Sequence, residues 1–183
     1  MAINIQRAIR CSAEELCAPG MPEKLVELIE GALVEVTPAG HFHNKLAFRF
    51  QLLFEKFTAG QNDLEVGYSD EGYLLRRNPD TILCPDAALF RRRPEGASNW
   101  LEFGPEIVVE ILSPSNSLAE MTYKRQVFFA AGTEQCWIMD PKAESLQVHH
   151  RDGRVEHISK EGTYSGEGIV KGLEVNLRSL LKR

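Results

Sequence analysis

The stretch Ile107-Val108-Val109-Glu110-Ile111-Leu112 decides the fold. All but one of its residues are aliphatic, and a short run of this kind is typical of a strand buried on both faces of a sheet. Glu110 is the exception. A lone carboxylate is costly to bury unless it is paired with a cation or bound to a metal. The stretch therefore predicts a buried strand and, within it, a charged residue that needs a partner.

Amphipathic helices are predicted both before and after this strand. From 43 to 57, apolar residues recur at steps of three and four and form one buried stripe, while charged residues face away. That stripe consists of Leu46, Phe50, Leu53, Phe54 and Phe57. In the second helix, Ser117 and Glu120 have the spacing of a capping box, and Gly132 closes the helix after about 131.

Shorter strands and turns fill the rest of the chain. Glu30-Gly31 and Asp152-Gly153 each lie between two apolar runs and predict hairpins. Other strands are expected at 64–67, 73–76, 82–90, 136–139 and 173–177, with a small helix capped by Ser12 and a last helical turn at 178–181. This order predicts an α/β or α+β fold, in which a mixed sheet is flanked by helices and carries additional hairpins.

Length and composition limit the possible classes of protein. The 183 residues suit one domain, 1–183, with 1–21 as a short lead-in. A net charge of -5 disfavours nucleic-acid binding through bulk charge, although a local basic patch with a metal ion stays possible. No apolar run approaches the length of about 20 residues that a membrane span requires. The four scattered cysteines form no C-x-x-C pair, so a reducing cytoplasm is expected.

Three charged residues lie where burial is expected. Alternation within 82–90 places Asp86 on the same strand face as Ala88, and Glu110 interrupts the buried strand. If the two strands are neighbours, the carboxylates of Asp86 and Glu110 make a plausible site for Mg²⁺ or Mn²⁺. Lys124 lies on a partly apolar helix face and can extend its ammonium towards the sheet. A cation beside two carboxylates and a metal suits phosphoryl chemistry.

Simpler interpretations of these three residues stay open. Asp86 follows Pro85 and could end a strand in water. Glu110 and Lys124 could form a structural ion pair, and Lys124 could be solvated.

The histidines have simple explanations as well. His41 and His43 have a chelating spacing only if their segment is extended, so a loop or the start of a helix suits them better. His149 and His150 are adjacent in a predicted strand, point to opposite faces, and cannot easily share one metal.

Neither a nucleophile elbow nor a glycine-rich phosphate loop is present. Ser113 and Ser115 suit the turn before the second helix, or a contact with phosphate. Arg91-Arg92-Arg93 suits a solvated loop, or a local phosphate-binding patch.

Several motifs together resemble the putative restriction endonuclease family, a former domain of unknown function within the PD-(D/E)XK nuclease superfamily. The resemblance extends from about 12 to 181. The motifs are Glu27-Leu28-Ile29-Glu30-Gly31-Ala32-Leu33-Val34, Pro85-Asp86-Ala87-Ala88, Val108-Val109-Glu110-Ile111-Leu112-Ser113-Pro114-Ser115, Lys124-x3-Phe128-x3-Gly132, Trp137-Ile138-Met139-Asp140-Pro141 and Gly172-Leu173-Glu174-Val175.

The resemblance implies a restriction-endonuclease-like core and assigns site residues. Asp86 matches the aspartate of the superfamily motif and Glu110 its second acidic residue. Leu112 stands where the literal motif has lysine, and Lys124 on the helix takes that place. Gln135 replaces a frequent glutamate and would remove a charge near the site. Phe128 and Cys136 replace frequent tyrosines.

The function expected from these residues is metal-dependent endonuclease activity, acting on DNA. Asp86 and Glu110 would hold Mg²⁺ or Mn²⁺ with the carbonyl oxygen of Ile111, and Lys124 would assist catalysis. Glu27 is a second-tier metal ligand. A homodimer is expected, because two sites related by a two-fold axis suit the two strands of a duplex. The alternatives are a non-catalytic nucleic-acid-binding or regulatory module and a structural homo-oligomeric domain.

Overall fold

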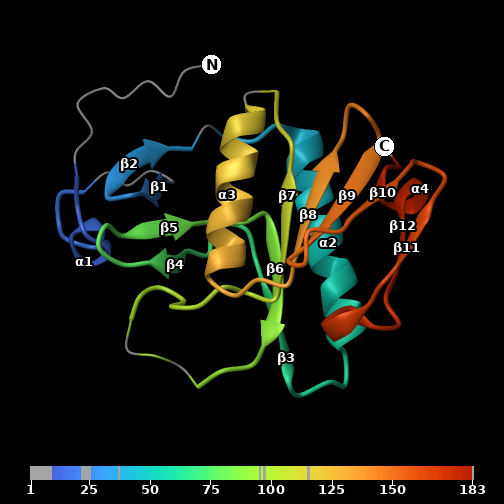
Figure 1. Cartoon of the computed structure of the whole chain (residues 1–183), viewed down its shortest axis with the longest axis horizontal. Helices are drawn as coiled ribbons and strands as arrows, with labels where there is room; N and C mark the ends of the chain where they lie inside the picture. The colour runs from blue at the N-terminus through green and yellow to red at the C-terminus, as the bar shows by residue number, and fades with distance from the viewer. Residues whose placement is uncertain are drawn as a thin grey trace.

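A mixed six-stranded sheet forms the centre of the molecule, and the strand that carries Glu110 lies inside it (Figure 1). The computed structural model describes residues 10–21, 26–36, 38–94, 96, 98–114 and 116–182. In the order β10-β9-β8-β7-β6-β3, only β7 and β8 are parallel neighbours. The strands are β3 (Leu64–Gly67), β6 (Ala87–Arg91), β7 (Ile107–Ile111), β8 (Gln135–Asp140), β9 (Ser145–His150) and β10 (Val155–Ile158).

A second, four-stranded sheet lies beside the first, in the order β2-β1-β5-β4. Its strands are β1 (Val26–Ile29), β2 (Ala32–Glu35), β4 (Tyr73–Arg76) and β5 (Thr81–Leu83). The predicted hairpin between β1 and β2 is confirmed. Both Glu30 and Gly31 have positive φ angles, 52° and 79°, as a tight two-residue hairpin turn requires.

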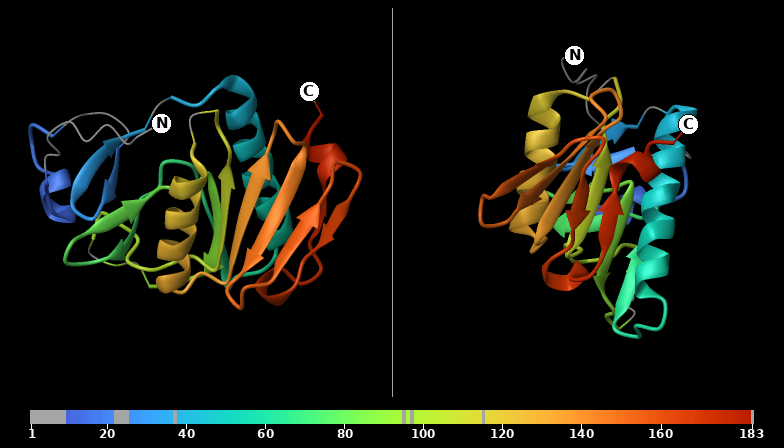
Figure 2. Two further views of the ribbon diagram at one scale, coloured as in Figure 1. Left: turned by 45° about the horizontal axis from the view of Figure 1, so that its top comes forward. Right: turned by 90° about the vertical axis from the view of Figure 1, so that its right-hand side faces the viewer.

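One long helix covers each face of the six-stranded sheet (Figure 2). The helix α2 (His41–Thr58) buries Leu46, Phe50 and Phe54 of the predicted stripe, while α3 (Leu118–Ala130) packs on the opposite face. Ser117 caps α3 by accepting a hydrogen bond from the backbone of Glu120. Among the described residues, no helix is both long and apolar enough to cross a membrane.

The prediction of one strand over 82–90 is wrong, because the chain changes sheets within this stretch. The segment 81–83 belongs to β5 in the small sheet, whereas 87–91 forms β6 in the large one. Pro85 lies at the break, where its missing N–H removes a donor that a continuous strand would need. Asp86 therefore precedes β6, and the alternation expected within 82–90 does not apply to it.

The ends of the chain add small elements. The predicted N-terminal helix is α1 (Ala13–Leu16), with a complete capping box between Ser12 and Glu15. The C-terminal strand is β12 (Glu174–Asn176), followed by α4 (Leu177–Leu180). Two further elements were not predicted: β11 (Thr163–Ser165), which pairs with β12, and the 3-10 helix η1 (Gly168–Val170). Residues of this region pack with α2 against the large sheet.

Candidate active site

Asp86 is fixed at the point where the chain enters the large sheet. Its backbone N–H donates to the carbonyl of Val109 at 3.0 Å, and β6 and β7 are antiparallel neighbours. Its backbone carbonyl accepts hydrogen bonds from Gln51 and Ser69, both at 2.9 Å. Its carboxylate Oδ2 accepts a 2.7 Å hydrogen bond from the backbone N–H of Ile111. Asp86 is therefore held from α2, the turn after β3, and β7.

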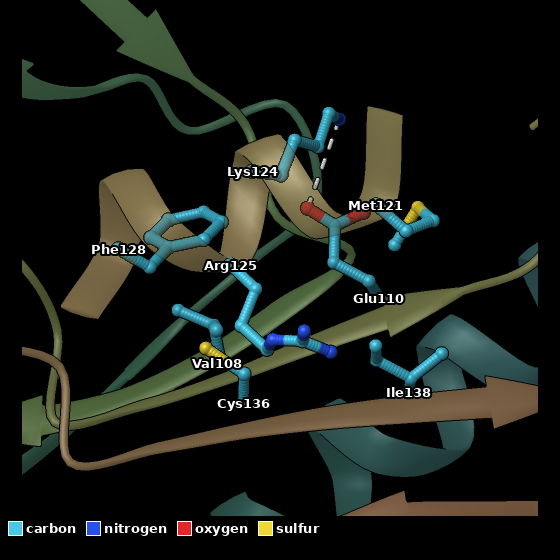
Figure 3. A pocket seen from close by; sticks show the side chains of 8 residues that line it. All are labelled: Val108, Glu110, Met121, Lys124, Arg125, Phe128, Cys136 and Ile138. Atoms are coloured by element: carbon cyan, nitrogen blue, oxygen red, sulfur yellow. Dashed lines mark ion pairs between the residues drawn. The ribbon is translucent and has the colours of Figure 1, made fainter. Parts of the chain in front are cut away.

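Glu110 points from β7 towards α3, where it meets Lys124 (Figure 3). The Lys124 ammonium lies 3.7 Å from Glu110 Oε1. Lys124 is only 7% exposed, so the alternative of a solvated lysine is wrong. Glu110 Oε1 is itself buried and accepts no hydrogen bond from the described part of the protein.

Glu27 is brought into the same site from the other sheet. It is buried on β1, and its Oε1 lies 2.7 Å from the Lys124 ammonium. The same oxygen accepts a 3.2 Å hydrogen bond from the backbone N–H of Cys84. Lys124 thus lies between a carboxylate of the small sheet and a carboxylate of the large sheet.

Burial sets the electrostatics of this group. Removal from water raises the pKa of Glu110 to about 8, against the opposing effect of Lys124, and the nearby Asp86 and Glu27 raise it further. Burial also raises the pKa of Asp86, while His43 and the Ile111 N–H oppose that rise. Burial alone would lower the pKa of Lys124, but Glu110 and Glu27 raise it above its ordinary value. Lys124 therefore stays charged.

His43 is a site residue that the sequence analysis assigned only to a loop or helix start. Its Nε2 lies 2.9 Å from the carbonyl oxygen of Ile111 and 3.4 Å from Asp86 Oδ2. Because a carbonyl oxygen only accepts, Nε2 carries the hydrogen in this contact. The signal was present in the sequence: His43 precedes Leu46 and Phe50 by three and seven residues, which places it on the buried stripe of α2.

Gln135 is not near the carboxylates, and the expectation that it changes the charge of the site is wrong. It begins β8 opposite Ile107, whereas Glu110 lies opposite Ile138 further along the strand. Its amide oxygen accepts hydrogen bonds from Trp137 at 2.8 Å and Tyr164 at 3.1 Å. Gln135 therefore belongs to the core on the α2 side, not to the α3 side where Glu110 points.

The paired histidines do point to opposite faces, as predicted. His149 contacts Arg125 of α3. His150 lies 2.8 Å from Glu156 through Nε2 and 3.1 Å from Glu167 through Nδ1, and Arg154 pairs with both glutamates. One ligand atom from each of His150, Glu156 and Glu167 lies within 4.8 Å of the others, but Arg154 already supplies a cation to both carboxylates, so the group forms an ion-pair network.

The other candidates from the sequence do not join the carboxylates. Arg93 and Ser113 instead form contacts within the protein. Arg93, in the predicted basic patch, pairs with Glu106 at 3.0 Å and lies over the Phe103 ring. In the turn before α3, the N–H and the hydroxyl of Ser113 both donate to the side-chain oxygen of Asn116, and the Ser113 carbonyl accepts from the Asn116 N–H. Ser115 lies outside the described residues.

Three carboxylates and one ammonium thus converge where the two sheets meet α3. Carboxylate oxygens are ligands that Mg²⁺ and Mn²⁺ accept, and the excess of negative charge favours a bound divalent cation. The buried Oε1 of Glu110, to which no described residue donates a hydrogen bond, fits the same role. The donor set is therefore compatible with a metal ion between Asp86 and Glu110.

The comparisons with known proteins agree with this fold. A search of curated proteins finds no match. A solved structure, titled a putative nuclease of the DUF820 group from Anabaena variabilis, superimposes with a TM-score of 0.80 at 18% sequence identity. The match covers 93% of this chain and 97% of the other. The model of the Uma2 family, described as putative restriction endonucleases, matches residues 13–178. Because that match spans most of the sequence, the chain belongs to this family.

Proposed function

We propose that the protein is a metal-dependent endonuclease that hydrolyses phosphodiester bonds in DNA. The observation that carries the proposal is the convergence of Asp86, Glu110 and Lys124 beside the end of β7. Membership of a nuclease family supports the reaction class. Metal dependence and a DNA substrate go beyond the family description and are proposed here.

Asp86 and Glu110 would hold Mg²⁺ or Mn²⁺, with the carbonyl oxygen of Ile111 as a third oxygen. When bound, such an ion activates a water and stabilises negative charge on the scissile phosphate. The backbone N–H of Ile111 keeps Asp86 oriented without using its second carboxylate oxygen.

Lys124 would stabilise charge on the phosphate, since its ammonium is buried, charged and held in place. Glu27 at 2.7 Å orients the ammonium, and Glu110 at 3.7 Å keeps it next to the proposed metal position. Such positioning of a cation before the reaction is a large source of rate enhancement in phosphoryl transfer. Glu27 is thus proposed as a positioning residue for Lys124, with direct metal binding as its alternative role.

Plasmid nicking in Mg²⁺ or Mn²⁺ tests the proposal. Wild type should nick supercoiled DNA, whereas Asp86→Asn and Glu110→Gln should reduce nicking to background. Asp63→Asn and Glu174→Gln make the same chemical changes at exposed positions and should leave nicking unchanged. If either Asp86→Asn or Glu110→Gln still nicks DNA at the wild-type level, the assignment of these two residues to the active site is contradicted.

A non-catalytic role has one observation in its favour, the short buried ion pair between Lys124 and Glu27. A folded wild type that binds DNA without cutting it in either metal would support that role. A homodimer, which would bring two sites to the two strands of a duplex, is also proposed, and sedimentation of the chain with and without duplex tests it.

A further inference from the structure

Glu110, Lys124 and Arg125 are among the residues that line a small hollow between α3 and the large sheet. The Lys124 side chain extends towards Glu110, whereas the Arg125 side chain extends past Val108 towards β8 (Figure 3). Arg125 is half-buried. Among the described residues it pairs with no carboxylate, in contrast to Arg93.

A neutral histidine holds the Arg125 guanidinium in place. Its Nη1 lies 3.2 Å from Nδ1 and 3.3 Å from Nε2 of His149. Burial, and then the charge of Arg125, lower the pKa of His149 to about 4, so the ring is neutral at pH 7. His149 Nε2 also lies 3.1 Å from the amide oxygen of Gln147. That oxygen only accepts, so Nε2 donates to Gln147 and Nδ1 accepts from Arg125.

This chain of contacts orients Arg125 without neutralising it. A half-buried guanidinium with its full charge is costly unless an anion compensates it. No carboxylate among the described residues pairs with Arg125, which lines the same hollow as Glu110 and Lys124, where the proposed substrate would bind. A phosphate matches the forked donors of a guanidinium, which can bind two of its oxygens at once.

We propose that Arg125 is a substrate-positioning residue that binds a backbone phosphate of the nucleic acid next to the scissile phosphate. The inference rests on the proposed function. It adds the path of the nucleic-acid strand, which would run from the end of β7 across α3 towards β9. The hollow is too narrow to enclose a nucleotide, so the guanidinium would meet a backbone group at its mouth. A net charge of -5 makes such local cations necessary, since bulk charge does not attract DNA.

Fluorescence anisotropy with a short labelled DNA duplex tests this role separately from catalysis. Measured in a Glu110→Gln background, which the proposed function makes inactive, Arg125→Gln should raise Kd roughly tenfold at low salt. It should also reduce the slope of log K against log salt by about 0.9, the value for one lost phosphate contact on duplex DNA. In the wild-type background, the same substitution should raise KM of nicking more than it lowers kcat.

Arg178→Gln is the matched control, because it removes the same charge from an exposed position on α4. It should leave both Kd and the salt slope unchanged. Arg125→Lys keeps the charge but loses the fork, so its salt slope should match the parent while Kd rises. His149→Gln retains an acceptor for Arg125 and should bind DNA nearly as well as the parent, whereas His149→Leu should resemble Arg125→Gln.

Two results would overturn the inference. One is that Arg125→Gln behaves like Arg178→Gln in Kd and slope, even if its melting temperature falls, which would make Arg125 a structural tie between α3 and β9. The other is that the protein binds no duplex at all. If wild type binds DNA with the predicted dependence on Arg125 but never cuts it, the proposed catalysis fails and the phosphate contact stands.

Discussion

Glu110 is a carboxyl group that the fold has largely removed from water. Its pKa rises from an ordinary value of 4.5 to about 8, mainly because burial disfavours the charged form. The folded protein therefore holds this proton more tightly than the unfolded chain does. Between pH of about 4.5 and about 8 the unfolded chain releases the proton and the folded protein keeps it, so the free energy of unfolding falls as pH rises through that window.

Glu110→Gln should remove this pH dependence. Relative to the variant, wild type should lose about 1–3 kcal/mol of unfolding free energy between pH 5 and pH 8.5, since each unit of pKa shift corresponds to about 1.4 kcal/mol and relaxation of the site lowers the realised value. Urea denaturation of both proteins in EDTA, at several pH values, measures the difference. If the unfolding free energies of the two proteins change with pH in parallel, burial does not raise the pKa of Glu110.

Lys124 combines a proposed chemical role with a structural one. Lys124→Met leaves Glu27 buried without its cation and should cost about 3–5 kcal/mol of unfolding free energy. Adding Glu27→Gln removes the stranded charge, so the double variant should be more stable than Lys124→Met alone. Thermal melting of the four proteins of this cycle measures the coupling.

Activity of the double variant separates the two roles. If Glu27→Gln alone still nicks DNA, a folded Lys124→Met/Glu27→Gln protein that does not nick DNA would place Lys124 in the chemistry. If the double variant is folded and as active as wild type, the only role of Lys124 is its structural ion pair with Glu27.

At the level of elements, periodicity predicted the helices well and misjudged one strand. The stripe on α2 and the cap of α3 are local features, fixed by spacing and by hydrogen bonds within a few residues. The division of 81–91 into β5 and β6 depends on which sheet each half pairs with, and no local pattern records that choice. Pro85 was the one local sign of a break. Asp86 was nevertheless proposed as a site residue, because a charged residue within an apolar stretch is unusual.

The helix α2 connects the site to the rest of the large sheet through His43. His43→Ala removes the donor at the Ile111 carbonyl and the contact with Asp86, so kcat of nicking should fall about tenfold or more. His41→Ala is the control, because His41 lies two residues earlier on the same helix and is exposed. Equal kinetics for the two variants would reduce His43 to a packing residue, and a metal-free melting curve checks that each variant is folded.

At the level of the whole molecule, the candidate site lies at a junction. Glu27 belongs to the small sheet, Glu110 to the large one, and Lys124 to the helix that packs between them. Residues so distant in sequence meet only through tertiary packing. The sequence could therefore propose the Asp86–Glu110–Lys124 set only through unusual residue types and a family resemblance, and it left Glu27 in second place. The position of Gln135, on the opposite side of the sheet, was likewise decided by packing.

A metal bound at this junction should stabilise the whole fold, because a ligand that binds only the folded state adds RT ln(1 + [L]/Kd) to the free energy of unfolding. At a Mg²⁺ concentration about a hundredfold above Kd, the gain is about 2.7 kcal/mol. Mg²⁺ titration during thermal melting should therefore raise the Tm of wild type by several degrees in a saturable way. Asp86→Asn should abolish the saturable shift, whereas Asp63→Asn should retain it. A shift of equal size in wild type and Asp86→Asn would mean that Mg²⁺ acts elsewhere on the protein, and the two-carboxylate metal site would then be wrong.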